Sequence, residues 1–231
     1  YDVPVGGVWT DEQLEKLQRQ CAEHKLNMEV IESIPVHEDI KMGKGKRDEY
    51  IDNYCKNIEV VARHGVRCIC YNFMPVFDWL RTDMYHKNED GSTSLSYSYD
   101  DFVKVDPNNL HLPGWDESYS PAELQGLLKA YRKISHEQLF ENLVYFLKRV
   151  IPVCDKMGVS MAIHPDDPPW DVFGLPRIVS CEKDLDAMFA AVPSKNNGLT
   201  LCTGSFGASK KNDLVKMAAK YTKQGRVHFA H

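Results

Sequence analysis

Three short apolar runs in the last third of the chain decide the fold: Val159-Ser-Met-Ala-Ile-His164, Gly198-Leu-Thr-Leu-Cys202 and Arg226-Val-His-Phe-Ala-His231. Each run has the length of a β-strand. Helical patterns over 180–192 and 213–221 separate one run from the next. Short apolar strands that alternate with helices predict βαβ units on a parallel sheet.

The upstream chain extends this alternation to the order α-β-α-β-α-α-β-α-β-α-β. Its first helix begins at a capping box, Thr10-Asp-Glu-Gln13, in which the hydroxyl and the Gln side chain satisfy end amides. The other upstream elements that the pattern predicts are strands at 28–31 and 66–71 and helices at 48–64, 121–131 and 135–157.

The sequence also predicts a helix cap, a helix irregularity and a long insertion. Ser180 is the expected cap of helix 180–192, and Pro152 is expected to kink or break helix 135–157. Residues 73–120 form a long polar and aromatic segment, which reads as an insertion. Loops of that size are usually functional.

Both a doubly wound sheet and a barrel fit the alternation. The chain opens in what reads as a loop after a strand, and it stops at the end of another strand. A parallel edge strand without its next helix would be poorly covered, which favours a barrel fragment. We therefore expect residues 1–231 to form one α/β domain. It would be a partial (β/α)8 TIM barrel with five strands, lacking the first and last ones.

Composition narrows the function. The formal net charge is −5 and the basic residues are interleaved with acids, so a nucleic-acid partner is not expected. No apolar stretch approaches the roughly 20 residues of a membrane span, and no secretory signal is visible. The seven cysteines lack paired spacing, which indicates a reducing compartment and a cytoplasmic location. Dinucleotide and P-loop fingerprints are missing from the sequence.

The carboxyl ends of parallel strands hold the active site in such folds. Three successive predicted strands end in His164, Cys202 and His231. Neighbouring strands lie about 4.8 Å apart, so these side chains can converge on one ion. Imidazole and thiolate suit zinc, iron or manganese. Any one of the three residues alone is more often structural, but together they predict a metal site.

Two nearby features bear on this site. His228 competes with His231 as a ligand, but side chains alternate along a strand and the two point to opposite faces, which favours His231. Asp166 and Asp167 follow His164. They are either partners that fix its ring or solvated acids of a turn, and both readings stay open.

Candidate substrate contacts follow the earlier strands. Asn72 lies at a strand end, and Arg81 is either a bidentate clamp for a substrate carboxylate or a member of a surface ion pair. His37 is either a substrate contact or a residue of a mobile loop.

Longer strings of the sequence resemble the mannonate dehydratase family of sugar-acid degradation. The likeness spans essentially the whole chain, and its long uncommon strings make it specific. They are Glu32-Ser-Ile-Pro-Val-His-Glu-Asp-Ile-Lys41, Cys70-Tyr-Asn-Phe-Met-Pro-Val-Phe-Asp-Trp79, Ala162-Ile-His-Pro-Asp-Asp-Pro-Pro169 and Val227-His-Phe-Ala-His231.

The resemblance implies a xylose-isomerase-like barrel that converts D-mannonate to 2-dehydro-3-deoxy-D-gluconate and water with Mn(II) or Fe(II). The family holds its metal with His, Cys, His and Asp in chain order, and the first three fall on His164, Cys202 and His231. The Asp, with a Tyr and a His near the substrate, would lie beyond residue 231. The reaction also needs a general base at C2 and a general acid at the C3 hydroxyl, and neither is assigned to a residue of this chain.

Other functions remain as alternatives. One is a metal-dependent sugar isomerase or epimerase on the same barrel, and another is a metal- or sugar-acid-binding fragment without turnover. The acidic charge disfavours a barrel-type DNA repair nuclease. The expected partner is a small sugar-acid substrate. Large barrels commonly associate, which favours a homo-oligomer.

Overall fold

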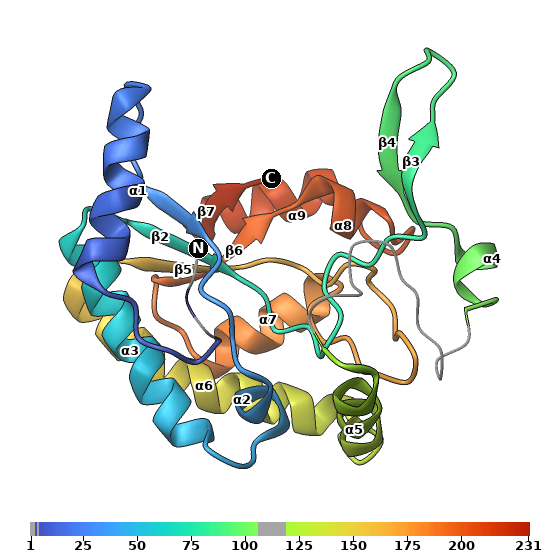
Figure 1. Ribbon diagram of the computed structural model, residues 1–231, viewed down its shortest axis with the longest axis horizontal. Coiled ribbons are helices and arrows are strands. Elements are labelled where there is room, and N and C mark those ends of the chain that lie inside the picture. The colour runs from blue at the N-terminus through green and yellow to red at the C-terminus, as the bar shows by residue number, and fades with distance from the viewer. Residues whose placement is uncertain (1–2, 4, 106–118) are drawn as a thin grey trace.

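A parallel sheet forms the centre of the computed structural model, which describes residues 3, 5–105 and 119–231 (Figure 1). Its five strands lie in the order β1-β2-β5-β6-β7, with every neighbouring pair parallel. The predicted alternation and the parallel sheet are thus confirmed. The strands are β1 (Val30–Glu32), β2 (Cys68–Tyr71), β5 (Ser160–Ile163), β6 (Asn197–Leu201) and β7 (Val227–Ala230).

Helices connect these strands, and the six predicted ones are all present. The capping box at Thr10 and Gln13 is also confirmed. The six helices are α1 (Asp11–Glu23), α3 (Arg47–Arg63), α5 (Pro121–Tyr131), α6 (His136–Met157), α7 (Glu182–Ala191) and α9 (Leu214–Lys223). Within the described residues, three shorter helices were not predicted: α2 (Glu38–Met42), α4 (Tyr99–Phe102) and α8 (Thr203–Gly207).

The sheet is strongly curved. Strands three places apart in a flat sheet would lie about 14 Å from each other, because neighbours are about 4.8 Å apart. β2 and β7 have this relation, yet some of their Cα atoms lie within 8 Å of each other. Cys70 Sγ on β2 also reaches Thr200 Oγ1 on β6 at 3.1 Å, across β5. The sheet therefore curls into a half-barrel whose concave face carries these two side chains.

Alternation along the strands separates the two faces. Large side chains such as Ile69, Met161 and Leu199 pack on the helices in the main core. Between them, smaller side chains such as Ala162 and Thr200 line the concave face. β7 approaches β6 closely at Gly198, where a Cβ would collide with the side chain of His228 on β7 and with the carbonyl of Arg226 just before it. Small residues on the inner face therefore let the sheet bend.

Helices α3 and α6 run side by side along the convex side of the sheet (Figure 1). The predicted apolar face of α3 is confirmed, since Ile51, Ile58 and Val61 are completely buried. Tyr54 of α3 meets Phe146 of α6 edge-to-face, with ring centroids 5.0 Å apart. This layer holds the outer face of the sheet.

Some local predictions were wrong. The N-cap of α7 is Cys181 and not Ser180, because the Asp184 carboxylate accepts the backbone N–H groups of both residues. The break predicted at Pro152 is absent, because α6 continues through this residue to Met157, and the alternative of a kink stays a prediction. Pro152 and Lys148, whose carbonyl it leaves without a helical donor, are both exposed, so water can take the place of that donor.

The segment 73–120 contains more structure than a loop. β3 (Asp83–Lys87) and β4 (Thr93–Ser96) pair as an antiparallel hairpin, which stands out from the body in Figure 1. Its side chains are mostly exposed, so they lack the apolar alternation that predicts a strand. Residues 106–118 of the predicted insertion lie outside the described residues.

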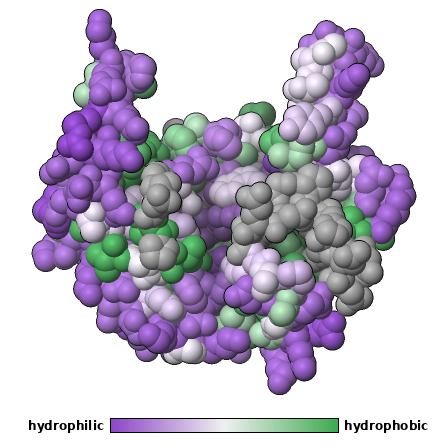
Figure 2. All heavy atoms as spheres, viewed as in Figure 1, coloured by the Kyte–Doolittle hydropathy of each residue, from purple (hydrophilic) through white to green (hydrophobic). Residues whose placement is uncertain are grey.

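The face shown in Figure 2 is mainly hydrophilic, with small apolar patches scattered over it. Among the helices in the described ranges, none combines the length and the apolar character that a membrane-spanning segment needs.

We predict that Pro152→Ala raises the free energy of unfolding by up to about 2 kcal/mol. Proline costs about 3 kcal/mol relative to alanine inside a helix, and its stiffening of the unfolded chain offsets about 1 kcal/mol of this. Urea unfolding followed by circular dichroism measures the change. Lys148→Ala, an exposed position one turn earlier, is the control and should change stability by less than about 0.5 kcal/mol. A less stable Pro152→Ala variant would contradict this account of α6.

Candidate metal centre

His164, Cys202 and His231 converge at the carboxyl ends of three adjacent strands. Each offers one ligand atom, and these atoms all lie within 4.8 Å of one another. His164 and Cys202 are buried, whereas His231 is exposed. The predicted convergence is therefore present in the structure, and the role of the three residues as metal ligands stays a prediction.

A backbone carbonyl fixes the ring of His164. Its Nδ1 donates to the Pro165 carbonyl at 2.8 Å, and a carbonyl can only accept, so Nδ1 carries the proton. Nε2 is then the nitrogen that can bind a metal, and without one it contacts Nδ1 of His231 at 3.4 Å and hydrogen-bonds Cys202. Trp79 packs edge-on against the same ring, with centroids 5.3 Å apart. The buried imidazole thus presents a single nitrogen to the site.

Cys202 has the environment of a thiolate. Ser205 donates its backbone N–H to Cys202 Sγ at 3.5 Å, and its hydroxyl lies 3.3 Å from the same sulfur. Burial raises the pKa of Cys202, but hydrogen bonds from His164, Ser205 and His231 outweigh it and lower the pKa to about 6. Burial lowers the pKa of His164, and the hydrogen bond and negative charge of Cys202 more than reverse that effect. Two imidazoles and a thiolate form a donor set that fits a borderline divalent ion.

His228 lies outside this group, in keeping with the preference for His231. The pairing of β6 with β7 shifts register between Leu199 and Thr200, which leaves His228 as an extra residue on β7. Its Nε2 hydrogen-bonds the Lys195 carbonyl at 2.8 Å. His231 instead stacks on Phe229, with ring centroids 6.2 Å apart.

Neither reading of the two aspartates after His164 is correct. The Asp166 carboxylate is buried and accepts the N–H groups of Ile178 and Val179, both at 2.7 Å. Burial raises the pKa of Asp166 although backbone donors oppose the shift. Asp167 is partly buried and forms an ion pair elsewhere. Among the described residues it is a backbone carbonyl that fixes the His164 ring.

Arg81 and Asn72 are both bound to protein groups. Arg81 holds the Asp167 carboxylate with both terminal nitrogens, at 3.2 and 3.1 Å. Asn72 donates to Asp78 at 3.1 Å and accepts the N–H of Met74 at 3.1 Å. The ion-pair reading of Arg81 is therefore confirmed. Substrate contact by either residue stays a prediction.

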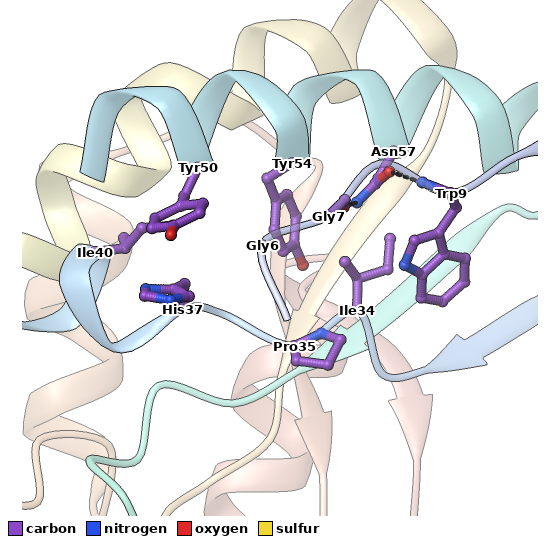
Figure 3. A pocket seen from close by; sticks show the side chains of 10 residues that line it. All are labelled: Gly6, Gly7, Trp9, Ile34, Pro35, His37, Ile40, Tyr50, Tyr54 and Asn57. Atoms are coloured by element: carbon purple, nitrogen blue, oxygen red, sulfur yellow. Dashed lines mark hydrogen bonds between the residues drawn. The ribbon is translucent and has the colours of Figure 1, made fainter. Parts of the chain in front are cut away.

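His37 lies in a small pocket that contains none of the three candidate ligands (Figure 3). Its ring stacks on Tyr50 of α3, with centroids 3.8 Å apart, and its Nδ1 accepts the N–H of Asp39 at 3.0 Å. His37 is thereby the N-cap of α2. Burial lowers the pKa of His37 despite the nearby carboxylates of Asp39 and Glu38. Its predicted contact with substrate stays untested.

His37 also borders a wider cleft of about 890 Å³ between α2 and α5. Lys41 and Glu38 form a buried ion pair of 2.7 Å at its base. Lys41 also donates to the Met74 carbonyl at 2.7 Å, and Tyr131 donates its hydroxyl to Glu38 at 2.5 Å. These buried charges are thus compensated within the protein.

Two residues of the site were missed by the sequence reasoning. Ser205 belongs to α8, whose sequence Thr203-Gly-Ser-Phe-Gly207 resembles a loop because of its glycines. The sequence nevertheless held a signal. When Cys202 caps a helix, the backbone N–H of the residue three positions later, which is Ser205, points at its sulfur. Trp79 stands in a loop with positive φ, and nothing in the local sequence indicates its contact with His164.

Comparison with known proteins identifies the family. The family model described as D-mannonate dehydratase (UxuA) matches residues 1–231. The chain belongs to the mannonate dehydratase family. Mannonate dehydratase 2 of Halalkalibacterium halodurans is 50% identical over 233 residues, which cover 100% of this chain and 68% of the relative.

A crystal structure of mannonate dehydratase from Streptococcus suis serotype 2 has a TM-score of 0.91 and 44% identity. The match covers 100% of this chain and 63% of the streptococcal one, so the chain spans less than two thirds of that mannonate dehydratase. A 3-keto-D-glucoside 4-epimerase from E. coli, at 10% identity and a TM-score of 0.56, covers 96% of this chain and 64% of its own. The latter likeness shows the fold alone.

We predict that alkylation of Cys202 by iodoacetamide has a pH midpoint near 6 in metal-free protein. The thiolate is the reactive form, and a lowered pKa makes it the main form above that pH. Peptide mapping by mass spectrometry over a pH series measures each cysteine separately. Cys55 and Cys181 are the controls, because burial raises the pKa of both and they should react only at alkaline pH. A Cys202 midpoint at or above 8 would contradict the proposed thiolate environment.

Proposed function

We propose that this chain supplies the metal-binding part of a mannonate dehydratase, which converts D-mannonate to 2-dehydro-3-deoxy-D-gluconate with Mn(II) or Fe(II). The observation that carries the proposal is the convergence of His164, Cys202 and His231 within 4.8 Å, in a chain of that family. Because the chain spans 63% of the solved mannonate dehydratase, the activity is proposed for the full-length protein.

The ligand atoms follow from the hydrogen bonds around the site. His164 would bind through Nε2, since its Nδ1 is engaged with the Pro165 carbonyl. Cys202 would bind through its sulfur, and His231 through a ring nitrogen. When bound, the divalent ion supplies Lewis-acid stabilisation for charge that develops beside the substrate carboxylate. The ring of Trp79 covers one side of His164 and limits access of water to that ligand.

The polar residues around the site have separate tasks in this proposal. Arg81 and Asn72 would contact the substrate only by giving up their present partners. Their first role in this proposal is therefore to hold the loop that follows β2. His37 remains the candidate contact at the cleft between α2 and α5. The base at C2 and the acid at the C3 hydroxyl are not assigned to residues of this chain.

We also propose that the curved sheet is part of a complete (β/α)8 barrel in the full-length protein. The close approach of β2 and β7 supports this closure, because a flat doubly wound sheet would keep them about 14 Å apart. The metal, the cytoplasmic location and a homo-oligomeric state remain predictions.

Cys202→Ala in the full-length protein should reduce affinity for Mn(II) or Fe(II) by about a hundredfold or more and abolish keto-acid formation from D-mannonate. Loss of a partner outside the ligand set already costs about 10–100-fold, and removal of the thiolate itself should cost more. Metal analysis after dialysis and product analysis measure the two effects.

Cys181→Ala is the matched control, because Cys181 is partly buried and lies outside the site. Full metal retention in Cys202→Ala would contradict the ligand assignment. A wild-type protein that binds metal and isomerises sugars, but leaves D-mannonate unchanged, would favour the isomerase alternative.

A further inference from the structure

A chain of polar contacts links Cys202 to the loops after two other strands. Ser205 Oγ lies 3.3 Å from Cys202 Sγ and 3.3 Å from Asp167 Oδ2. Asp167, in the loop after β5, is held by both terminal nitrogens of Arg81, in the loop after β2. Ser205 itself belongs to α8, directly after β6. The sulfur is therefore connected to a charged pair beyond the three candidate ligands.

The Ser205 hydroxyl has one proton and two anionic acceptors. The thiolate of Cys202 and the carboxylate of Asp167 lie at the same distance from its oxygen. Ser205 is only 3% exposed, so water competes poorly for either contact. The acceptor with the greater negative charge density will take the larger share of the proton. Arg81 neutralises the charge of Asp167 and thereby makes its carboxylate a weaker acceptor for the Ser205 proton.

We propose that Ser205 is a positioning residue for the Cys202 thiolate, and that the Arg81–Asp167 ion pair controls how strongly the Ser205 hydroxyl binds that sulfur. This inference rests on the proposed metal centre. Hydrogen bonds to a metal-bound thiolate orient its lone pairs and reduce the electron density that it donates. The three side chains thus adjust the sulfur–metal bond without touching the metal.

We call the contacts that run from Arg81 through Asp167 and Ser205 to the Cys202 sulfur the relay. Substitutions along the relay should change the electron density on the sulfur in opposite directions. Removing the hydroxyl takes one hydrogen-bond donor away from the sulfur and makes the sulfur more electron-rich. Removing the Arg81 charge should act in the same direction, because an unneutralised Asp167 draws the proton away from the sulfur. Removing the Asp167 charge should act in the opposite direction, because an amide is the weaker acceptor and the hydroxyl then turns to the sulfur.

Co(II) loaded into the full-length protein tests this through the charge-transfer absorption from the thiolate to cobalt. A more electron-rich sulfur absorbs at longer wavelength. We expect a shift to longer wavelength in Ser205→Ala and Arg81→Gln, a shift to shorter wavelength in Asp167→Asn, and a loss of Co(II) affinity of about 10–100-fold in Ser205→Ala. The controls are Ser209→Ala, just after α8, and Asp171→Asn, in the loop after β5, and both should match the wild type.

The outcomes separate the relay from the metal centre on which it rests. A wild-type band that disappears in Cys202→Ala supports the metal centre. If wild type, Ser205→Ala and Asp167→Asn then have identical bands and affinities, the relay alone is overturned. Shifts of the same sign in Asp167→Asn and Arg81→Gln would overturn the role of the ion pair. A wild-type protein without a thiolate band would overturn both proposals. Asp167→Asn and Arg81→Gln keep the test decisive if Ser205→Ala folds poorly.

Discussion

The curvature of the parallel sheet is the constraint on which the candidate site depends. Three ligand atoms from three strands can lie within 4.8 Å only if the strand ends lean toward a common centre. Small residues on the concave face permit this bend, as the contact of Cys70 with Thr200 across Ala162 shows. On the convex face, the packing of α3 and α6 buries the large strand side chains. Most of the energy that holds the site in place therefore comes from apolar burial outside it.

The same curvature brings distant loops together. Arg81 and Asp167 are separated by 86 residues in the chain and Asp167 and Ser205 by 38, yet they form one chain of contacts that ends at Cys202. An ion pair that is only partly exposed gains from the reduced access of solvent. It also holds the loops after β2 and β5 in one arrangement around the sulfur. Support for the proposed thiolate ligand thus comes from several strand ends at once.

The sequence predicted what depends on local pattern and could not predict what depends on tertiary partners. The apolar strands, the face of α3 and the capping box at Thr10 follow from spacing, and the strand-end positions of His164, Cys202 and His231 follow from the strands. The cap at Cys181 depends on Asp184, a local capping-box signal three residues later that the prediction overlooked. The continuity of α6 through Pro152 depends on solvent, which the local pattern does not register. For Arg81 the sequence allowed a clamp for a substrate carboxylate, with a surface ion pair as the default. The position of Asp167, which local pattern does not reveal, confirms the ion pair, and substrate contact by Arg81 stays a prediction.

The most direct test of the central claim is X-ray absorption at the metal edge of the Mn(II)- or Fe(II)-loaded full-length protein. We expect one sulfur neighbour and the multiple-scattering signature of two imidazoles, and we expect the sulfur signal to vanish in Cys202→Ala. A first coordination sphere made only of oxygen and nitrogen in the wild-type protein would contradict the assignment of Cys202, and with it the metal centre proposed for this chain.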